Sequence, residues 1–169
     1  MTNPRSLRDA ASSVATNLRL KIRHRSHPNY PWLFLPREKD IIDNIVDLWL
    51  QVRDVHRYPT ISTHLIQDNG NLDLVTQKTG RSFDDDPRRH ISDAYPIIWA
   101  DRPLATGVLH TPFPGKILVI IALEDLNDQN GLPSNIGHIP CGGFAVHSGD
   151  EDMKFKKQGG GLAFFILLN

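Results

Sequence analysis

Hydrophobic residues recur at helical spacing in two stretches of the first third of the chain. The apolar positions of these stretches are Leu7, Ala11, Val14 and Leu18, and then Ile41, Ile45, Leu48 and Val52. Both sets place their members every three or four residues, which predicts two amphipathic helices. The second helix should run from Pro36 to about Val55, because proline favours a helix start and Pro59 prevents a longer continuation.

The segment between these helices, residues 28–36, contains three prolines and cannot continue either helix. We expect an extended strap here, with Trp32, Phe34 and Leu35 covering the core. The same apolar strap is a candidate contact surface for a partner.

From Thr60 onward, polar and apolar positions alternate with a period of two, which is typical of strands. We expect a hairpin from Thr60 to Thr76 with its turn at Asp68–Asn71, followed by a polar loop over residues 79–90. The further strand candidates are Tyr95–Ala100, Leu104–His110, Lys116–Leu123, Gly143–His147, Met153–Lys156 and Leu162–Leu168. The continuous apolar runs in 117–123 and 162–168 should be central strands, buried on both faces or on one tightly packed face.

These elements predict a single structural domain of the α+β class that is mainly β. Residues 1–59 would form the N-terminal helical segment and strap, and residues 60–169 the β core. We expect the N-terminal helices to pack on a jelly-roll-like core, which is a closed or two-sheet β structure. The alternative is an open mixed α+β sheet with the helix on one face. Strands and helices do not alternate in the second half, which argues against a Rossmann-type sheet.

The composition narrows the function classes. The 169 residues suffice for one core, and 19 Lys and Arg balance 19 Asp and Glu. This balance argues against a protein that coats nucleic acid or an acidic membrane by bulk charge. The apolar runs are much shorter than the roughly 20 residues that span a bilayer. One cysteine, Cys141, excludes an internal disulfide framework and a Cys-rich zinc module, so we expect a reducing, cytoplasmic location.

Basic residues outnumber acidic residues in the first 27 positions, where Asp9 is the single acid. Four cations between Arg19 and Arg25 alternate with other residues, so an extended backbone would place them on one face. Such a ribbon would bind nucleic acid or an acidic partner in a salt-dependent manner. A docked surface helix and an organelle-targeting signal are the alternatives.

Histidines are the main candidates for chemistry, because the chain contains eight of them and no common catalytic or nucleotide-binding motif. His110 stands at a predicted strand end, and His138 and His147 flank the last glycine-rich turn. In a small β-barrel, such histidines converge at the mouth and bind a divalent metal such as Fe, Mn, Ni or Zn. Surface or loop histidines are the alternative. Cys141 is either a nucleophile with His138 or His147 as its base, or an incidental cysteine.

Two acidic runs and one glycine run are the remaining candidate binding sites. Asp84–Asp86 and Asp150–Asp152 are interpreted as solvated loops, with a hard cation as the alternative ligand. Gly159–Gly161 is interpreted as a flexible turn before the last strand. None of these runs matches a calcium-loop or phosphate-loop pattern.

Two stretches of the second half resemble motifs of the double-stranded β-helix superfamily. Residues Ile121–Leu132, an apolar strand followed by an Asp-rich turn and an Asn-Gly pair, resemble phytanoyl-CoA-dioxygenase-like enzymes after their first iron ligands. Residues Ile139–Met153 are similar to the second conserved motif of cupins, in which a ligand histidine follows Pro-x-Gly. The resemblance implies a jelly roll whose iron is held by His-x-Asp and a distal histidine.

The chain departs from both ligand patterns. Pro112 stands two residues after His110, where the carboxylate ligand of the dioxygenases belongs. Ala145 occupies the expected histidine position of the cupin motif, and the nearest histidine is His147. The two resemblances therefore agree on the architecture more than on the metal chemistry.

Two functions follow as hypotheses. The first is a small cupin-like metal-binding protein that acts as an oxygenase or isomerase on a small polar substrate. The second is a non-enzymatic jelly-roll protein for interaction or assembly, such as a capsid-like subunit that forms homo-oligomers.

Overall fold

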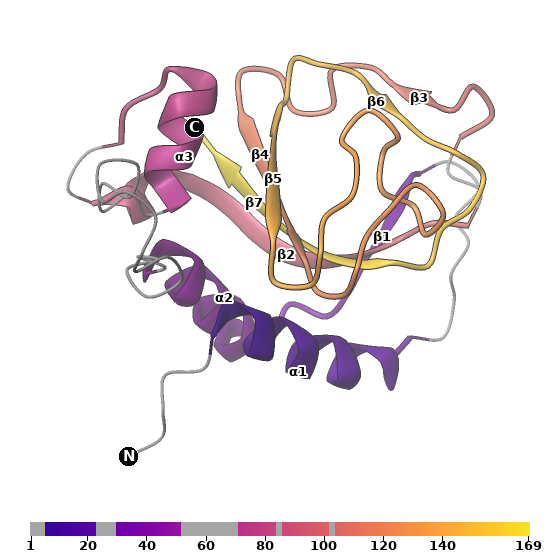
Figure 1. The fold of residues 1–169 in the computed structure, drawn as a ribbon, viewed down its shortest axis with the longest axis horizontal. Coiled ribbons are helices and arrows are strands. Elements are labelled where there is room, and N and C mark those ends of the chain that lie inside the picture. The colour runs from indigo at the N-terminus through magenta and orange to yellow at the C-terminus, as the bar shows by residue number, and fades with distance from the viewer. Residues whose placement is uncertain (1–5, 23–29, 52–70, 84–85, 102–103) are drawn as a thin grey trace, which may run out of the picture.

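The computed structural model describes residues 6–22, 30–51, 71–83, 86–101 and 104–169. The helices are α1 (Leu7–Arg19), α2 (Lys39–Gln51), α3 (Asn71–Thr79) and the 3-10 helix η1 (Pro87–His90). The strands are β1 (Trp32–Phe34), β2 (Ile91–Trp99), β3 (Val108–Leu109), β4 (Ile117–Ala122), β5 (Phe144–Ser148), β6 (Met153–Lys154) and β7 (Leu162–Leu168). Helices therefore precede most of the strands along the chain (Figure 1).

Five strands form one antiparallel sheet in the order β1-β2-β7-β4-β5, and β3 pairs with β6 in a separate two-stranded sheet (Figure 1). β7 occupies the centre, between β2 and β4. Every residue of β4 and β7 is buried, which confirms that the two apolar runs are central strands. The strands expected at 104–110 and 153–156 are shorter than predicted.

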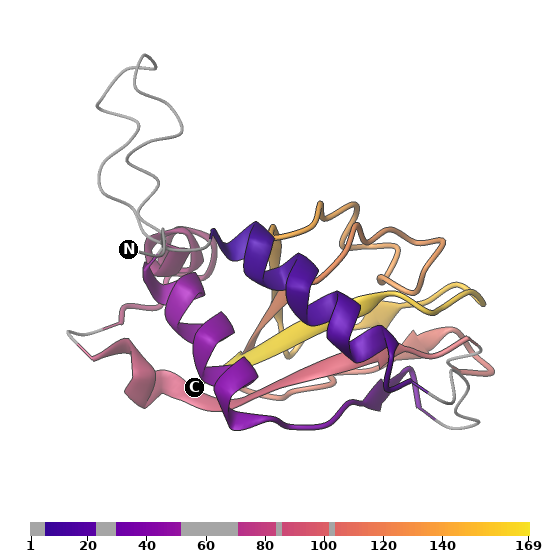
Figure 2. The same cartoon turned by 90° about the horizontal axis from the view of Figure 1, so that it is seen from below.

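The central strands are continuously apolar because both faces of the sheet are covered. Ile117, Val119 and Ile121 of β4 pack on one face with residues of α1, α2 and α3. Figure 2 shows α1 and α2 side by side across this face, which we call the helix face. Leu118 and Ile120 point to the opposite face, where β3, β6 and their connecting segments cover them. We call this the loop face.

Both predicted N-terminal helices are present. The residues buried by α1 include the predicted stripe of Leu7, Ala11, Val14 and Leu18. The Ser6 Oγ accepts the backbone N–H of Asp9 at 3.1 Å, which caps the start of α1. α2 begins at Lys39 and buries Ile45 and Trp49, while its expected end near Val55 lies outside the described residues.

The expected return strand of the hairpin is wrong, since residues 71–79 form α3. Val75 is fully buried and Leu72 packs beside it, which is helical spacing. The Asn71 amide donates a 2.6 Å hydrogen bond to the carbonyl of Trp49 in the last turn of α2. This contact satisfies a helix-end carbonyl from a distant part of the sequence, so local alternation did not reveal it. The outgoing strand expected at Thr60–Ile66 lies outside the described residues.

The fold is α+β, with N-terminal helices packed on an antiparallel sheet, as expected. The jelly roll is not confirmed. A jelly roll packs two multi-stranded sheets face to face. Here one face of a five-stranded sheet is covered by helices, and the other by loops and the β3-β6 pair. This arrangement corresponds to the alternative of an open sheet with helical cover on one face. None of the helices that the structure describes is long and apolar enough to cross a membrane.

Candidate functional site

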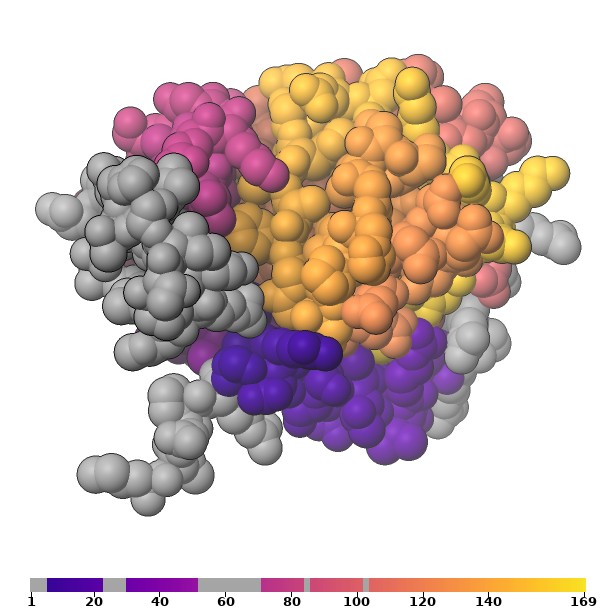
Figure 3. Space-filling view, viewed as in Figure 1, coloured from indigo at the N-terminus to yellow at the C-terminus, as the bar shows by residue number. Residues whose placement is uncertain are grey.

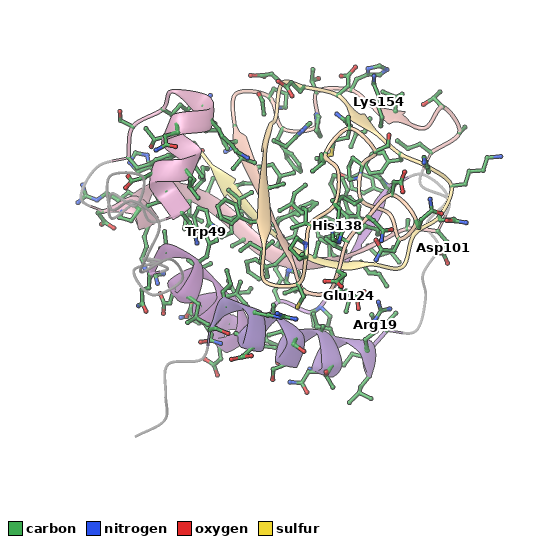
Figure 4. The ribbon with its side chains drawn as sticks, viewed as in Figure 1. Arg19, Trp49, Asp101, Glu124, His138 and Lys154 are labelled. Atoms are coloured by element: carbon green, nitrogen blue, oxygen red, sulfur yellow. The ribbon has the colours of Figure 1, made fainter. Side chains whose placement is uncertain are left out.

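The three histidines predicted as metal ligands lie in different surroundings. His110 follows β3, is exposed, and has its Nδ1 2.8 Å from Oδ2 of Asp152. His138 is exposed in the segment before β5 (Figure 4). His147 is buried in β5, where its Nε2 lies 3.0 Å from the carbonyl oxygen of Glu151.

The structure does not gather these histidines into one site. Among the described residues, no group of three or more His, Cys, Asp or Glu side chains is placed to hold a metal ion. The rings of His110 and His147 already have hydrogen-bond partners of their own. As placed, the three residues do not fit a shared ion of Fe, Mn, Ni or Zn, and metal binding stays a prediction.

The second acidic run holds a loop in place, although it was expected to be merely solvated. Asp150 Oδ1 accepts the backbone N–H of Gly115 at 2.9 Å. Asp152 Oδ1 accepts the N–H of Thr111 at 3.1 Å, while its Oδ2 pairs with His110. These bonds hold the segment before β4 against the turn after β5, so they explain the carboxylates without a cation.

The glycine run before β7 is a close-packed turn. Gly160 and Gly161 donate their N–H groups to the carbonyls of Trp99 and Asn130, at 2.8 and 2.7 Å. A Cβ at Gly159 would lie 2.1 Å from the carbonyl oxygen of Ala100. The N–H groups of Gly160 and Gly161 are therefore occupied within the fold and unavailable to a phosphate.

Cys141 lines a groove between α1 and the segment that follows β4, with a volume of about 440 Å³. Its walls are Arg8, Asp9, Ser12, Ala15, Thr16 and Arg19 of α1, together with Leu123, Glu124, Asp125 and Cys141. Figure 3 shows α1, in indigo, directly below the orange segments that form the other wall. We call this the α1 groove.

The prediction of a histidine-activated thiol is not supported. The Cys141 Sγ lies 3.4 Å from the carbonyl oxygen of Leu123, and no hydrogen bond joins it to any histidine that the structure describes. Burial raises the pKa of this thiol above its usual range, and the neighbouring Asp125 carboxylate raises it further. The thiol is therefore protonated at neutral pH, whereas a nucleophile needs the thiolate.

Two cations of the predicted basic ribbon are paired with acids inside the fold. Arg19, at the end of α1, forms an ion pair with Glu124 (Figure 4) and donates to the carbonyl of Gly160 at 2.8 Å. Lys21 forms an ion pair with Glu38. The other two cations, at 23 and 25, lie outside the described residues, so nucleic-acid or acidic-partner binding stays a prediction.

Aromatic side chains are exposed at the β1 edge of the sheet. Phe34 is 55 % exposed and Tyr30 is 40 % exposed, although both belong to the strap expected to cover the core. The Phe34 ring meets that of Tyr95 edge-on at 5.0 Å. The Arg37 guanidinium lies 4.7 Å from the centre of the Tyr95 ring. We call the exposed residues Tyr30, Phe34 and Arg37, which lie beside the buried Tyr95 ring, the β1 aromatic surface.

The backbone of β1 leaves one side open. Leu35 donates its N–H to Pro96, and Pro31 accepts from Ala100, so Leu33 is the strand residue whose backbone faces β2. The alternation then turns the N–H and C=O groups of Trp32 and Phe34 away from the sheet. Within the part of the chain that the structure describes, these groups have no backbone partner.

No family model, curated protein or solved structure matches this chain. The α1 groove and the β1 aromatic surface are therefore the features of this protein from which a function can be inferred. Sequence analysis missed the α1 groove, although Arg8, Ser12, Thr16 and Arg19 form a second, polar stripe at helical spacing along α1. This polar stripe, which lies beside the apolar stripe of α1, was the sequence signal that could have indicated the groove.

Proposed function

We propose that this protein is a non-enzymatic assembly subunit that pairs with a second copy of itself through β1 and the β1 aromatic surface. The observation that carries the proposal is the 55 % exposure of Phe34 on an edge strand with an open backbone side. The proposal keeps the assembly part of the second hypothesis and leaves out its jelly-roll fold. A relationship to double-stranded β-helix proteins remains a prediction, and the proposal does not depend on it.

The side chains at this edge have the composition of a protein interface. Tyrosine, phenylalanine and arginine are enriched where proteins contact one another. Phe34 exposes more of its surface than any other aromatic residue among those described. Arg37 is held in place by Asp93, with the two nitrogen–oxygen distances at 3.0 and 3.3 Å. An apolar centre beside a fixed ion pair matches the core and rim of an interface.

The backbone geometry favours a second copy as the occupant. If a two-fold axis passes beside Leu33, the outward groups of Trp32 in one copy face those of Phe34 in the other. The same pairing is repeated on the opposite side of the axis, which gives one continuous antiparallel sheet across both copies. Pro36 follows the strand at a position whose backbone would face outward, and it lacks an N–H group, so it limits the pairing on this side of the strand.

The metal-dependent oxygenase or isomerase hypothesis has no comparable support. It needs His110, His138 and His147 at one ion, and their observed surroundings differ. Elemental analysis of untagged protein tests this hypothesis separately, because metal content does not depend on how the copies pair.

The first prediction tests assembly through Phe34. We expect sedimentation equilibrium to show a dimer for the wild-type chain and a monomer for Phe34→Glu, since burying a carboxylate in the interface carries a large desolvation cost. Leu74→Glu is the matched control, because Leu74 is 40 % exposed on α3, which contacts β5 at the opposite edge of the sheet from β1 (Figure 1). This variant should remain dimeric. A wild-type monomer, or a dimeric Phe34→Glu protein, would overturn the proposal.

A further inference from the structure

We propose that the α1 groove binds a small zwitterion, with Arg8 receiving its carboxylate and Asp125 receiving its ammonium group. A free α-amino acid is the ligand class that this pairing describes. The site goes beyond the proposed assembly function, since its residues come from α1, from the segment after β4 and from the turn before β5.

The groove has the size and lining of a small-ligand site. Its volume of about 440 Å³ lies within the range of protein ligand pockets, at the lower end. One wall is the polar stripe of α1, and the opposite wall carries Glu124, Asp125 and Cys141. The apolar stripe of α1 is buried against the sheet, so the helix holds the polar stripe in a fixed position.

At one end of the groove the charges are already used within the fold. Glu124 Oε1 accepts the backbone N–H of Leu162 at 2.9 Å and also pairs with Arg19. Arg19 in turn donates to the carbonyl of Gly160. This pair ties α1 to the start of β7, so we assign it to structure and leave it out of the ligand contacts.

Away from this pair, one cation and two carboxylates remain available, and of the two carboxylates Asp125 lies on the wall opposite α1. The Arg8 guanidinium has no hydrogen bond or ion pair among the described residues, and Arg8 is exposed. Asp125 is exposed, and its Oδ1 accepts the backbone N–H of Cys141 at 2.8 Å. This bond orients the carboxylate and leaves Oδ2 free to bind a ligand cation.

Close packing fixes the two walls relative to each other. Gly142 has a φ of +79°, and a Cβ at this position would lie 2.5 Å from the Cα of Arg8. The backbone of Arg8 therefore rests directly on the turn that carries Cys141. Cys141 contacts both residues, because its Sγ lies 3.9 Å from the carbonyl oxygen of Arg8 and its N–H donates to Asp125.

The charge pattern favours a zwitterion over a simple ion. Two arginines and three carboxylates line the groove, and the Arg19–Glu124 pair offsets one charge of each sign. A simple anion at Arg8 would meet the carboxylates of Asp9 and Asp125, and a simple cation would meet Arg8. A ligand with both charges can pair its carboxylate with Arg8 on one wall and its ammonium group with Asp125 on the other. These charge-assisted hydrogen bonds give the ligand a defined orientation.

The second prediction tests this site by NMR titration of the full chain with L-alanine, and with ethylamine and propionate, which each carry one of its charged groups. We expect saturable shifts at the amides of Arg8, Ser12 and Cys141 with alanine, and at least about tenfold weaker binding of either fragment. Bound alanine should also slow alkylation of Cys141, because this residue lines the groove and its Sγ lies beside the backbone of Arg8.

Variants separate the ligand contacts from folding. Arg8→Gln and Asp125→Asn should each weaken alanine binding about tenfold, because each loses one charged partner. In the Asp125→Asn variant the side-chain amide oxygen would still accept the Cys141 N–H, so the wall should remain intact. Lys78→Gln and Asp73→Asn on α3 are matched controls outside the groove and should bind alanine like the wild type. Non-saturable shifts, equal binding of the fragments, or variants with unchanged affinity and unchanged thermal midpoints would overturn the proposal.

Discussion

The helix face and the loop face of the sheet are packed by different means. On the helix face, mostly aliphatic side chains of three helices meet those of the strands. On the loop face, aromatic residues of the sheet pack against aromatic residues of the covering segments, with Trp32, Tyr95, Trp99 and Phe165 in the strands and Phe113 and Phe155 in the cover. Helices provide a repeating surface from local periodicity, whereas loops must be positioned by individual contacts.

Side-chain to backbone hydrogen bonds, both local and between distant residues, position the loop face. The Asn130 side chain donates to the carbonyl of Asp125 at 2.8 Å, and Asn135 donates to that of Asp152 at 3.0 Å. Asn135 also accepts the N–H of Lys154 at 3.1 Å. These side-chain hydrogen bonds hold the covering segments in place, as the hydrogen bonds between strands would in a second large sheet. We therefore expect the loop face to tolerate substitution less well than the helix face.

The third prediction compares the two faces at neighbouring positions of β7. Phe164 and Phe165 are both fully buried and point to opposite faces. Each Phe→Ala change should cost about 3–5 kcal/mol of unfolding free energy. Phe165→Ala should be the more costly by about 1 kcal/mol, because Phe165 also loses ring contacts, among them those with Trp32 and Trp99. Urea denaturation measures both values, and a larger cost for Phe164→Ala would contradict the comparison.

The fourth prediction concerns two glycines that both have positive φ. A Cβ at Gly131 would lie 2.1 Å from the Cβ of Trp99 on the loop face, whereas Gly80 after α3 has nothing within 4 Å. Gly131→Ala should therefore cost about 3 kcal/mol, from backbone strain and overpacking together. Gly80→Ala should cost only the strain of about 1 kcal/mol. Thermal unfolding of the two variants tests the difference, and equal costs would show that the loop moves away from Trp99.

The contrast between local sequence patterns and contacts of distant residues also explains which parts of the fold the sequence predicts. The stripe of α1 follows from local periodicity, and the central strands at 117–123 and 162–168 follow from their continuous apolar runs. β5 was expected one residue earlier at both ends, at Gly143–His147 instead of Phe144–Ser148. The helix at Asn71 was missed because its stabilising bond goes to Trp49, 22 residues away. The exposure of Phe34 was also missed, since an aromatic residue in an apolar strap is expected to be buried.

The candidate sites depend even more on distant contacts. His110, His138 and His147 are similar as strand-end residues, but Asp152 and the Glu151 carbonyl give two of them separate partners. The α1 groove combines a helix near the N-terminus with Asp125 and Cys141, more than a hundred residues later. Periodicity identifies the α1 wall of the groove, but it identifies neither the irregular wall opposite nor the contact between the two.

The fifth prediction has the smallest effect and concerns the electrostatic contact that holds β3 and β6 together on the loop face. The hydrogen bond from His110 and that from the Thr111 N–H lower the pKa of Asp152 below its ordinary value of 3.8. Because the folded pKa is depressed, the stabilisation is complete above the unfolded pKa and is lost as the pH falls through the folded pKa. His110→Ala should raise the pKa of Asp152 only part of the way, since the Thr111 bond remains. NMR titration of the Asp152 carboxyl carbon measures this shift, with His138→Ala as the control. If the titration of Asp152 is the same in both variants, the His110 contact does not hold this edge of the loop face.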